Sequence, residues 1–315
     1  MRKTCLESVY KLAKRNKRVI FIGSDLGPGV LSEFKKKIPK RFIMEGVSEQ
    51  AIVGMAAGLA LEGYVPYVNT IATFLTRRCF EQIVIDLCLH DLPVKLIGNG
   101  GGLVYAPLGP THQAIEDISI LRTLPNMTIL APCDANEMKN LVDATLKWPH
   151  PTYIRLARGG DQIITKKNTK FIIGKSVIIK QPKDCLFLTT GTTTQIALSA
   201  AKKLEDEKNI KCGVIHFPSI KPLDSKALLK WIRKVKKIIT VEENVLSGGF
   251  GSGILEFCSE NLKDHLHKIS MIGLKDEFVD DYGDQNSLLN KYNINQLTLY
   301  KKMLSLVKKK WAKIF

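Results

Sequence analysis

A carboxylate, Glu49, stands at the start of an apolar stretch of very small residues in RFIMEGVSEQAIVGMAAGLALEGYVPYV, residues 41–68. The apolar run from 51 to 61 predicts a helix that is buried on most sides. Gly54 and Gly58 each cost about 1 kcal/mol relative to alanine inside a helix, so they predict another backbone or helix packed close to this face. Glu49 also has a structural explanation, because Ser48 can be the N-cap and acidic residues interact favourably with a helix N-terminus.

A second candidate for chemistry is His112, in the loop segment GPTHQ. An imidazole held beside a reacting carbon can hydrogen-bond or exchange protons with hydroxyl and carbonyl oxygens. A lone loop histidine is more often a surface residue, so the neighbouring motifs must decide whether His112 is catalytic.

The seven cysteines lack C-x-x-C spacing and are odd in number, which predicts reduced, buried thiols rather than a disulfide framework or a zinc site.

The elements that must position these residues alternate between helix and strand. Helical patterns at 4–15, 49–61, about 74–90 and 114–123 are each followed by an apolar strand, respectively RVIFIG, YVPYVNT, VKLIGN and NMTILAP. A helix over about 134–147 then leads into the strand PTYIRLAR. This rhythm predicts a mostly parallel sheet covered on both faces, with ligands at the carboxyl ends of the strands.

The chain is expected to form two α/β domains. A first domain over 1–165 is followed by a charged, irregular linker over 166–184, and a smaller α/β domain over 185–315 repeats the strand and helix pattern from CLFLTTG onward. With 315 residues and 45% hydrophobic content, the chain is long enough for two ordinary domains. No apolar run reaches transmembrane length and no signal peptide is recognisable, so a cytoplasmic protein that does not bind membranes is expected.

The composition is strongly basic, with 47 Lys and Arg against 30 Asp and Glu, a net charge of +17. The lysines are spread along the chain without the interleaved aromatic residues of a nucleic-acid stacking surface. A solvated basic surface is therefore expected rather than nucleic-acid binding. Such a surface would also attract phosphorylated substrates or an acidic partner.

Six sequence blocks resemble, in their order and in the spacing between them, the C-terminal half of thiamine-diphosphate-dependent transketolases. These blocks are GVSEQAIVGMAAGLAL, ATFLTRRCFEQI, GPTHQAIEDISILRTLPNMTILAPCDANE, PTYIRLARG, IKPLD and VEENVLSGGFGS. The likeness covers nearly the whole chain and is greatest to the C-terminal subunit of split transketolases. It implies a pyrimidine-binding domain of the thiamine-diphosphate-binding fold followed by a transketolase C-terminal domain.

The resemblance implies that Glu49 hydrogen-bonds a ring nitrogen of the cofactor's aminopyrimidine. Phe74 matches the aromatic residue lining that pocket, and Phe80 matches a second aromatic nearby, although core packing also explains both. Arg77 stands where a further family aromatic falls, as in vertebrate-type transketolases and deoxyxylulose-phosphate synthases. Asp25, in GSDLGPG, matches an aspartate near the aminopyrimidine but is equally well explained as a turn residue.

For the substrate, the resemblance implies that His112 lies near the reacting carbon and that Arg2 and Arg158 grip a sugar phosphate. The planar guanidinium suits that task, and Arg155 competes with Arg158 for it. The departures from the family pattern are Gly100 in place of a histidine, Leu108 in place of an aspartate, and Gly29 in place of a phosphate-clamp serine. The sugar contacts are therefore expected to be altered.

No G-D-G motif is present, so Mg²⁺ and the diphosphate of thiamine diphosphate are expected to be held mainly by a partner, an N-terminal transketolase subunit, in an α2β2 assembly. The expected reaction is transfer of a two-carbon ketol unit between sugar phosphates. Two enzymatic alternatives remain open, namely pyruvate decarboxylation as in deoxyxylulose-phosphate synthases and the β subunit of a 2-oxo acid dehydrogenase. A catalytically inactive regulatory or scaffold homologue and a basic nucleic-acid binder are the non-enzymatic alternatives.

Overall fold

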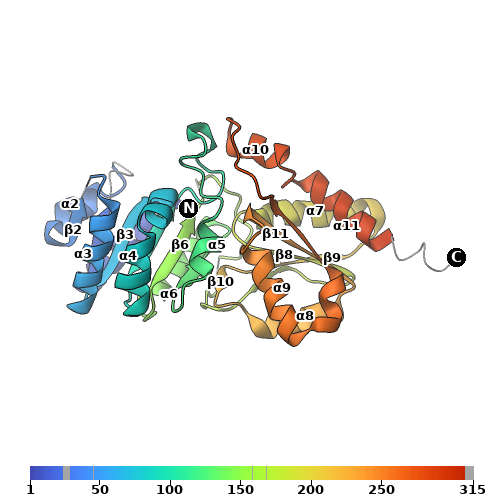
Figure 1. The fold of residues 1–315 in the computed structure, drawn as a ribbon, viewed down its shortest axis with the longest axis horizontal. Helices are drawn as coiled ribbons and strands as arrows, with labels where there is room; N and C mark the ends of the chain where they lie inside the picture. Colours follow the sequence, from blue (N-terminus) through green and yellow to red (C-terminus); the bar gives the residue numbers. More distant parts are fainter. Residues whose placement is uncertain (24–28, 45, 158, 168, 309–315) are drawn as a thin grey trace.

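The computed structural model describes residues 1–23, 29–44, 46–157, 159–167 and 169–308. They form two α/β units side by side, each built on its own sheet (Figure 1). The prediction of two α/β domains with mostly parallel sheets is confirmed. Within the described ranges, no helix combines the length and the apolar character needed to cross a membrane.

The first sheet has seven strands in the order β10-β5-β6-β4-β3-β1-β2. Neighbouring strands run parallel except β10, which is antiparallel to β5. The central strands are continuous buried runs such as VIFIG and KLIGN, as expected of a sheet covered on both faces. The strands are β1 (Val19–Gly23), β2 (Phe42–Met44), β3 (Val65–Ile71), β4 (Lys95–Asn99), β5 (Thr128–Leu130), β6 (Thr152–Leu156) and β10 (Ser219–Lys221).

Helices cover both faces of this sheet. One face packs on α1 (Arg2–Arg15) and α6 (Ala135–Thr145), which also contact each other. The other face packs on α3 (Glu49–Leu61) and on the helical segment 74–89. The remaining helices of this half are α2 (Ser32–Lys37), η1 (Pro39–Arg41), η4 (Ala106–Leu108) and α5 (Asp117–Arg122).

The helix expected over about 74–90 is present, but it is wound more widely than an α-helix. It consists of the π-helix η2 (Phe74–Arg78), a short α-helical turn, α4 (Phe80–Gln82), and a second π-helix, η3 (Ile83–Leu89). π-Turns are rare and occur frequently at functional sites. Here η2 begins at Phe74, one of the residues expected to line the cofactor site.

The second sheet has the strand order β12-β11-β8-β9-β7, and only β7 is antiparallel to its neighbour. Its strands are β7 (Val177–Lys180), β8 (Cys185–Thr189), β9 (Cys212–His216), β11 (Lys237–Val245) and β12 (Ile269–Leu274). Its helices are α7 (Thr193–Lys208), α8 (Ser225–Lys234), α9 (Phe250–Asn261), η5 (Lys263–Lys268), α10 (Gln285–Lys291) and α11 (Gln296–Lys308).

The two halves are joined by shared packing. One hydrophobic core runs from α3 and β1 through β5 and β10 to α8 and α9. Strand β7 lies inside the stretch expected to be a linker, and β10 crosses from the second half of the chain to complete the first sheet. The domain boundaries at 165 and 185 remain a prediction.

Candidate functional site

Glu49 is the first residue of α3 and its side chain is only 1% exposed. Its Oε2 accepts a hydrogen bond of 2.6 Å from Nη1 of Arg78. Its Oε1 is also buried, and among the described residues this oxygen has no hydrogen-bond partner. Buried polar atoms are nearly always satisfied in native proteins, so an unpartnered carboxylate oxygen suggests a ligand.

Glu49, Arg78, Phe74 and His112 form a continuous row. The guanidinium carbon of Arg78 lies 4.5 Å from the centroid of the Phe74 ring. The Phe74 ring in turn meets the imidazole of His112 edge-on, with centroids 5.1 Å apart and planes at 65°. The structure therefore brings together three residues that the sequence singled out, and adds Arg78.

Arg77 points away from Glu49, toward the loop that carries His112. It forms an ion pair with Glu116 and donates hydrogen bonds to the carbonyl oxygens of Pro110 and Gln113. The hydrogen bond to Glu116 raises the pKa of Arg77. These contacts tie η2 to the loop that carries His112, and the predicted role of Arg77 at the cofactor site remains a prediction.

The loop itself is held in one conformation. Gly109 has a φ of +74°, a conformation that glycine adopts without strain, and its carbonyl accepts from the backbone N–H of His112. Nδ1 of His112 lies 2.8 Å from the Thr111 hydroxyl oxygen. The neighbouring Gln113 is 1% exposed, and neither end of its side-chain amide has a partner in the described part of the chain.

A histidine at position 100 would require a strained backbone and a shift of the Tyr105 ring. The φ of Gly100 is +83°, and a Cβ at this position would overlap the ring of Tyr105. The Tyr105 ring therefore occupies the space next to Gly100, the position at which the resemblance led us to expect a histidine. Leu108, the second departure, is 53% exposed at the end of η4.

Arg155 is not available to a substrate phosphate. It is buried, it donates twice to the carboxylate of Asp117, and it donates to the carbonyl oxygens of Ala114 and Glu243. It therefore ties the segment after the GPTHQ loop to β11 of the second sheet. This removes Arg155 as a competitor of Arg158.

Four other predicted residues lie apart from this row or cannot be placed. Asp25 and Arg158 lie outside the described residues. Phe80 is half-buried and packs on the core rather than on the row. Arg2 is the half-buried first residue of α1, and the adjacent chain terminus lies 3.9 Å from Asp161.

An open cleft of about 600 Å³ lies beside the row, between the two halves of the chain. Arg77 and Glu116 line it on the side of the first sheet. Phe278, which is 78% exposed, lines it from the second half.

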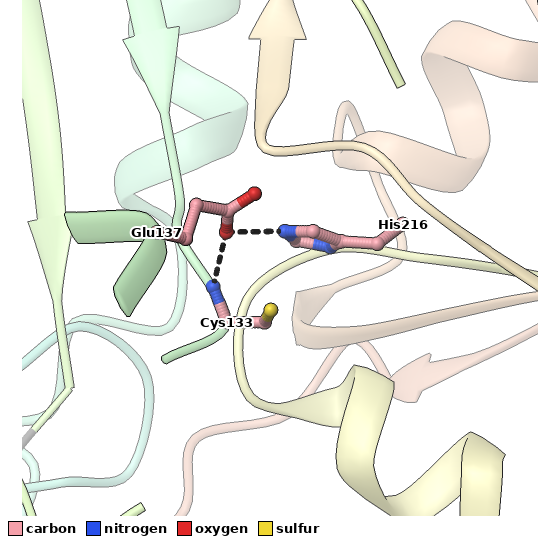
Figure 2. Close-up of side chains that lie close together, drawn as sticks. All are labelled: Cys133, Glu137 and His216. Atoms are coloured by element: carbon pink, nitrogen blue, oxygen red, sulfur yellow. Dashed lines mark hydrogen bonds and ion pairs between the residues drawn. The ribbon is translucent and has the colours of Figure 1, made fainter. Parts of the chain in front are cut away.

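A second buried polar group joins the two halves away from this row (Figure 2). Oε2 of Glu137, on α6, accepts from the backbone N–H of Cys133 and from Nε2 of His216, at the end of β9, both at 2.8 Å. Burial raises the pKa of the Cys133 thiol. The three donor types would suit a transition metal. The two hydrogen bonds satisfy Oε2 of Glu137, whereas its Oε1 is buried without a partner among the described residues. All seven cysteines are free and buried, as predicted.

Sequence reasoning missed Arg78 and Gln113. Arg78 follows Phe74 by four residues, a spacing that places two side chains on one face of a helix, so this signal was available. Gln113 offered no such signal, because its burial depends on the fold of the loop.

Comparison with known proteins accounts for both halves of the chain. Residues 1–160 match the family model described as transketolase, pyrimidine binding domain, and residues 174–296 match transketolase, C-terminal domain. An apulose-4-phosphate transketolase subunit of Phocaeicola vulgatus is 34% identical over 310 residues, covering 98% of this chain and 97% of that protein. The 1-deoxy-D-xylulose-5-phosphate synthase of Syntrophus aciditrophicus is 38% identical over 276 residues, and the match covers 87% of this chain and 42% of that protein.

Solved structures agree with these sequence matches. A structure described as a split gene transketolase, inactive beta4 tetramer, superimposes with a TM-score of 0.88 at 31% identity, covering 98% of this chain and 97% of that one. The transketolase of Campylobacter jejuni superimposes with a TM-score of 0.79 at 20% identity, covering 96% of this chain and 46% of that one, a likeness of fold. From the matched domains and the relatives over the full length, the chain belongs to the transketolase family.

Proposed function

We propose that this chain is the C-terminal subunit of a thiamine-diphosphate-dependent transketolase that moves a two-carbon ketol unit between sugar phosphates. The observation that carries the proposal is Glu49, a buried carboxylate with one unpartnered oxygen, which Arg78 links to the Phe74 ring and through it to His112. A buried carboxylate so placed can exchange a proton with a weakly basic ring nitrogen.

The residues present fit the aminopyrimidine end of the cofactor. The unpartnered Oε1 of Glu49 supplies a hydrogen-bond acceptor and the Phe74 ring supplies an apolar face. When bound, thiamine diphosphate supplies a nucleophilic carbon for the ketol transfer. The protein's own part is to hold the ring against Phe74, to hold or release a proton at Glu49, and to hydrogen-bond substrate oxygens from His112, which Thr111 and the Arg77-braced loop keep in place.

The diphosphate and its Mg²⁺ are assigned to a partner chain. The sequence has no G-D-G motif, and hard cations of this kind need oxygen ligands. The chain spans about half the length of the curated synthases it matches, but nearly all of the relative that is itself named as a transketolase subunit. Both facts favour a site completed by an N-terminal transketolase subunit in an α2β2 assembly.

The altered surroundings of His112 favour an unusual sugar. Tyr105 fills the space beside Gly100, and Leu108 is exposed on the same loop. By the resemblance, Gly100 and Leu108 stand where two hydrogen-bonding side chains are expected for common sugar phosphates. A modified or branched sugar phosphate is the substrate class that suits this change.

Synthase chemistry is the second candidate, because several relatives are 1-deoxy-D-xylulose-5-phosphate synthases. Incubating the reconstituted pair with pyruvate and an aldehyde phosphate separates the two. Ketol transfer predicts that two-carbon units move between sugar phosphates and that no carbon dioxide is released from pyruvate. Release of carbon dioxide at the rate of aldehyde consumption would contradict transketolase activity and favour the chemistry of the synthases or of the 2-oxo acid dehydrogenases.

A further inference from the structure

Arg78 is held much more loosely than its neighbour Arg77, although both lie on the wide turn η2. Arg77 has a carboxylate and two carbonyl oxygens as partners. Arg78 makes one ion pair, with Glu49, and one ring contact, with Phe74, and its side chain remains 45% exposed. Its guanidinium can therefore move into solvent without breaking a network.

We propose that Arg78 is a positioning residue whose guanidinium occupies, in the free chain, the place of the cofactor's aminopyrimidine ring and leaves it when the cofactor binds. This inference rests on the proposed function. The guanidinium is planar and carries N–H donors, and it contacts the same Phe74 ring and the same carboxylate as the proposed ligand, although through Oε2 rather than through the unpartnered Oε1. It lies 4.5 Å from the Phe74 centroid and donates at 2.6 Å to Glu49.

The position of Arg78 beside Glu49 stabilises the cofactor-free chain. A buried carboxylate without a cationic or hydrogen-bonding partner is costly, and Glu49 is 1% exposed. Arg78 satisfies one of its two oxygens and leaves Oε1 without a partner among the described residues. Arg78 therefore stabilises the buried Glu49 carboxylate in the free chain through one oxygen only. A ligand that hydrogen-bonds both carboxylate oxygens can displace the Arg78 guanidinium.

Displacement makes a specific prediction about affinity. When a binding site is partly occupied by its own side chain, the apparent dissociation constant rises as the unblocked fraction falls. Removing the guanidinium should therefore tighten thiamine diphosphate binding, whereas removal of an ordinary binding residue weakens it. The same change should destabilise the cofactor-free chain, because Glu49 loses its partner.

The test uses Arg78→Met, which keeps an apolar stem, and Arg15→Met as a matched control. Arg15 also pairs with a carboxylate, Asp143, but on the exposed surface of α1 and α6. Thiamine diphosphate with Mg²⁺ is titrated by calorimetry into each chain paired with the N-terminal subunit. Thermal melting of each cofactor-free chain is measured alongside, with Glu49→Gln and the double variant included to isolate the coupling between Glu49 and Arg78.

For Arg78→Met we expect binding tighter by about fivefold, and a cofactor-free melting temperature lowered by a few degrees, an effect that Glu49→Gln removes. Arg78→Lys, which keeps the charge but not the plane, should melt close to wild type. Weaker or unchanged binding by Arg78→Met, with the wild-type pair binding normally, would overturn the role of Arg78 alone. A wild-type pair that binds no thiamine diphosphate would overturn the proposed function and this inference together.

Discussion

At the scale of single residues, two buried carboxylates of this protein contrast in how their oxygens are used. Glu242, on β11, accepts backbone N–H bonds from Phe250 and Gly251 at 2.7 and 2.8 Å, and so caps the start of α9 with both oxygens. Glu49 uses one oxygen and leaves the other unpartnered in the described structure. The first carboxylate is explained by the fold, whereas the second one calls for a ligand.

The Glu242 carboxylate should make stability depend on pH. Burial raises its pKa from 4.5 to about 7, so between these values the folded chain binds more protons than the unfolded chain. Stability should therefore fall as pH rises from about 4.5 to about 7, by roughly 1 to 3 kcal/mol for this group. Glu242→Gln should remove most of that fall.

Urea unfolding of the isolated chain at several pH values checks this, with the exposed Glu260→Gln as a control. An unchanged slope of stability against pH in Glu242→Gln would show that the group is charged throughout the range. The sequence does not predict the raised pKa of Glu242, because two consecutive glutamates are typical of an exposed surface. The structure shows instead that β11 is buried.

At the scale of elements, α3 has glycines that its own chain does not require. A Cβ at Gly58 would meet nothing within 4 Å, and one at Gly54 would lie 3.8 Å from an oxygen of Asp86. Among the described residues, η3 therefore approaches α3 at Gly54, whereas no atom comes close to the position of Gly58. Leu61 on α3 and Leu89 on η3 are each 68% exposed, and we propose that the partner subunit packs on this surface.

Substituting Gly58 tests this explanation. Gly58→Ala should stabilise the isolated chain by up to about 1 kcal/mol, because alanine is the better helix former. Gly58→Leu should leave the isolated chain folded but weaken its association with the N-terminal subunit by at least about tenfold, a loss of about 1.4 kcal/mol. Sedimentation of the mixed subunits measures the association.

The matched control is Ser259→Leu, which adds an exposed leucine to α9 in the second half of the chain. It should leave the association unchanged. Normal assembly of Gly58→Leu would place the subunit contact elsewhere and leave the two glycines without an explanation.

At the scale of the whole molecule, the strands that sequence predicts best are the continuous apolar runs, such as β1 and β4. Their burial on both faces makes each run recognisable without its neighbours. The short β10 could not be predicted, because it exists only where residues 219–221 meet β5. The wide turns of η2 and η3 were equally hidden, since the apolar spacing over 74–90 also fits an ordinary helix.

The candidate site divides in the same way. Glu49, Phe74 and His112 were predicted from motif blocks, and the structure places Phe74 between the other two through Arg78 and a ring contact. The side-chain directions of two arginines depend on partners distant in sequence. Arg155 is buried against Asp117, and Arg77 pairs with Glu116. These contacts could not be predicted from the sequence.

The central claim is that this chain supplies the pyrimidine-side carboxylate of a site completed by a second subunit. The most direct test is calorimetric titration of thiamine diphosphate with Mg²⁺ into the chain alone and into the reconstituted pair, together with ketol-transfer assays of wild type and Glu49→Gln. We predict that only the pair binds the cofactor and that Glu49→Gln lowers transfer by at least about 100-fold without lowering the melting temperature of the pair. A pair that binds no cofactor, or a Glu49→Gln pair with unchanged transfer, would contradict the account.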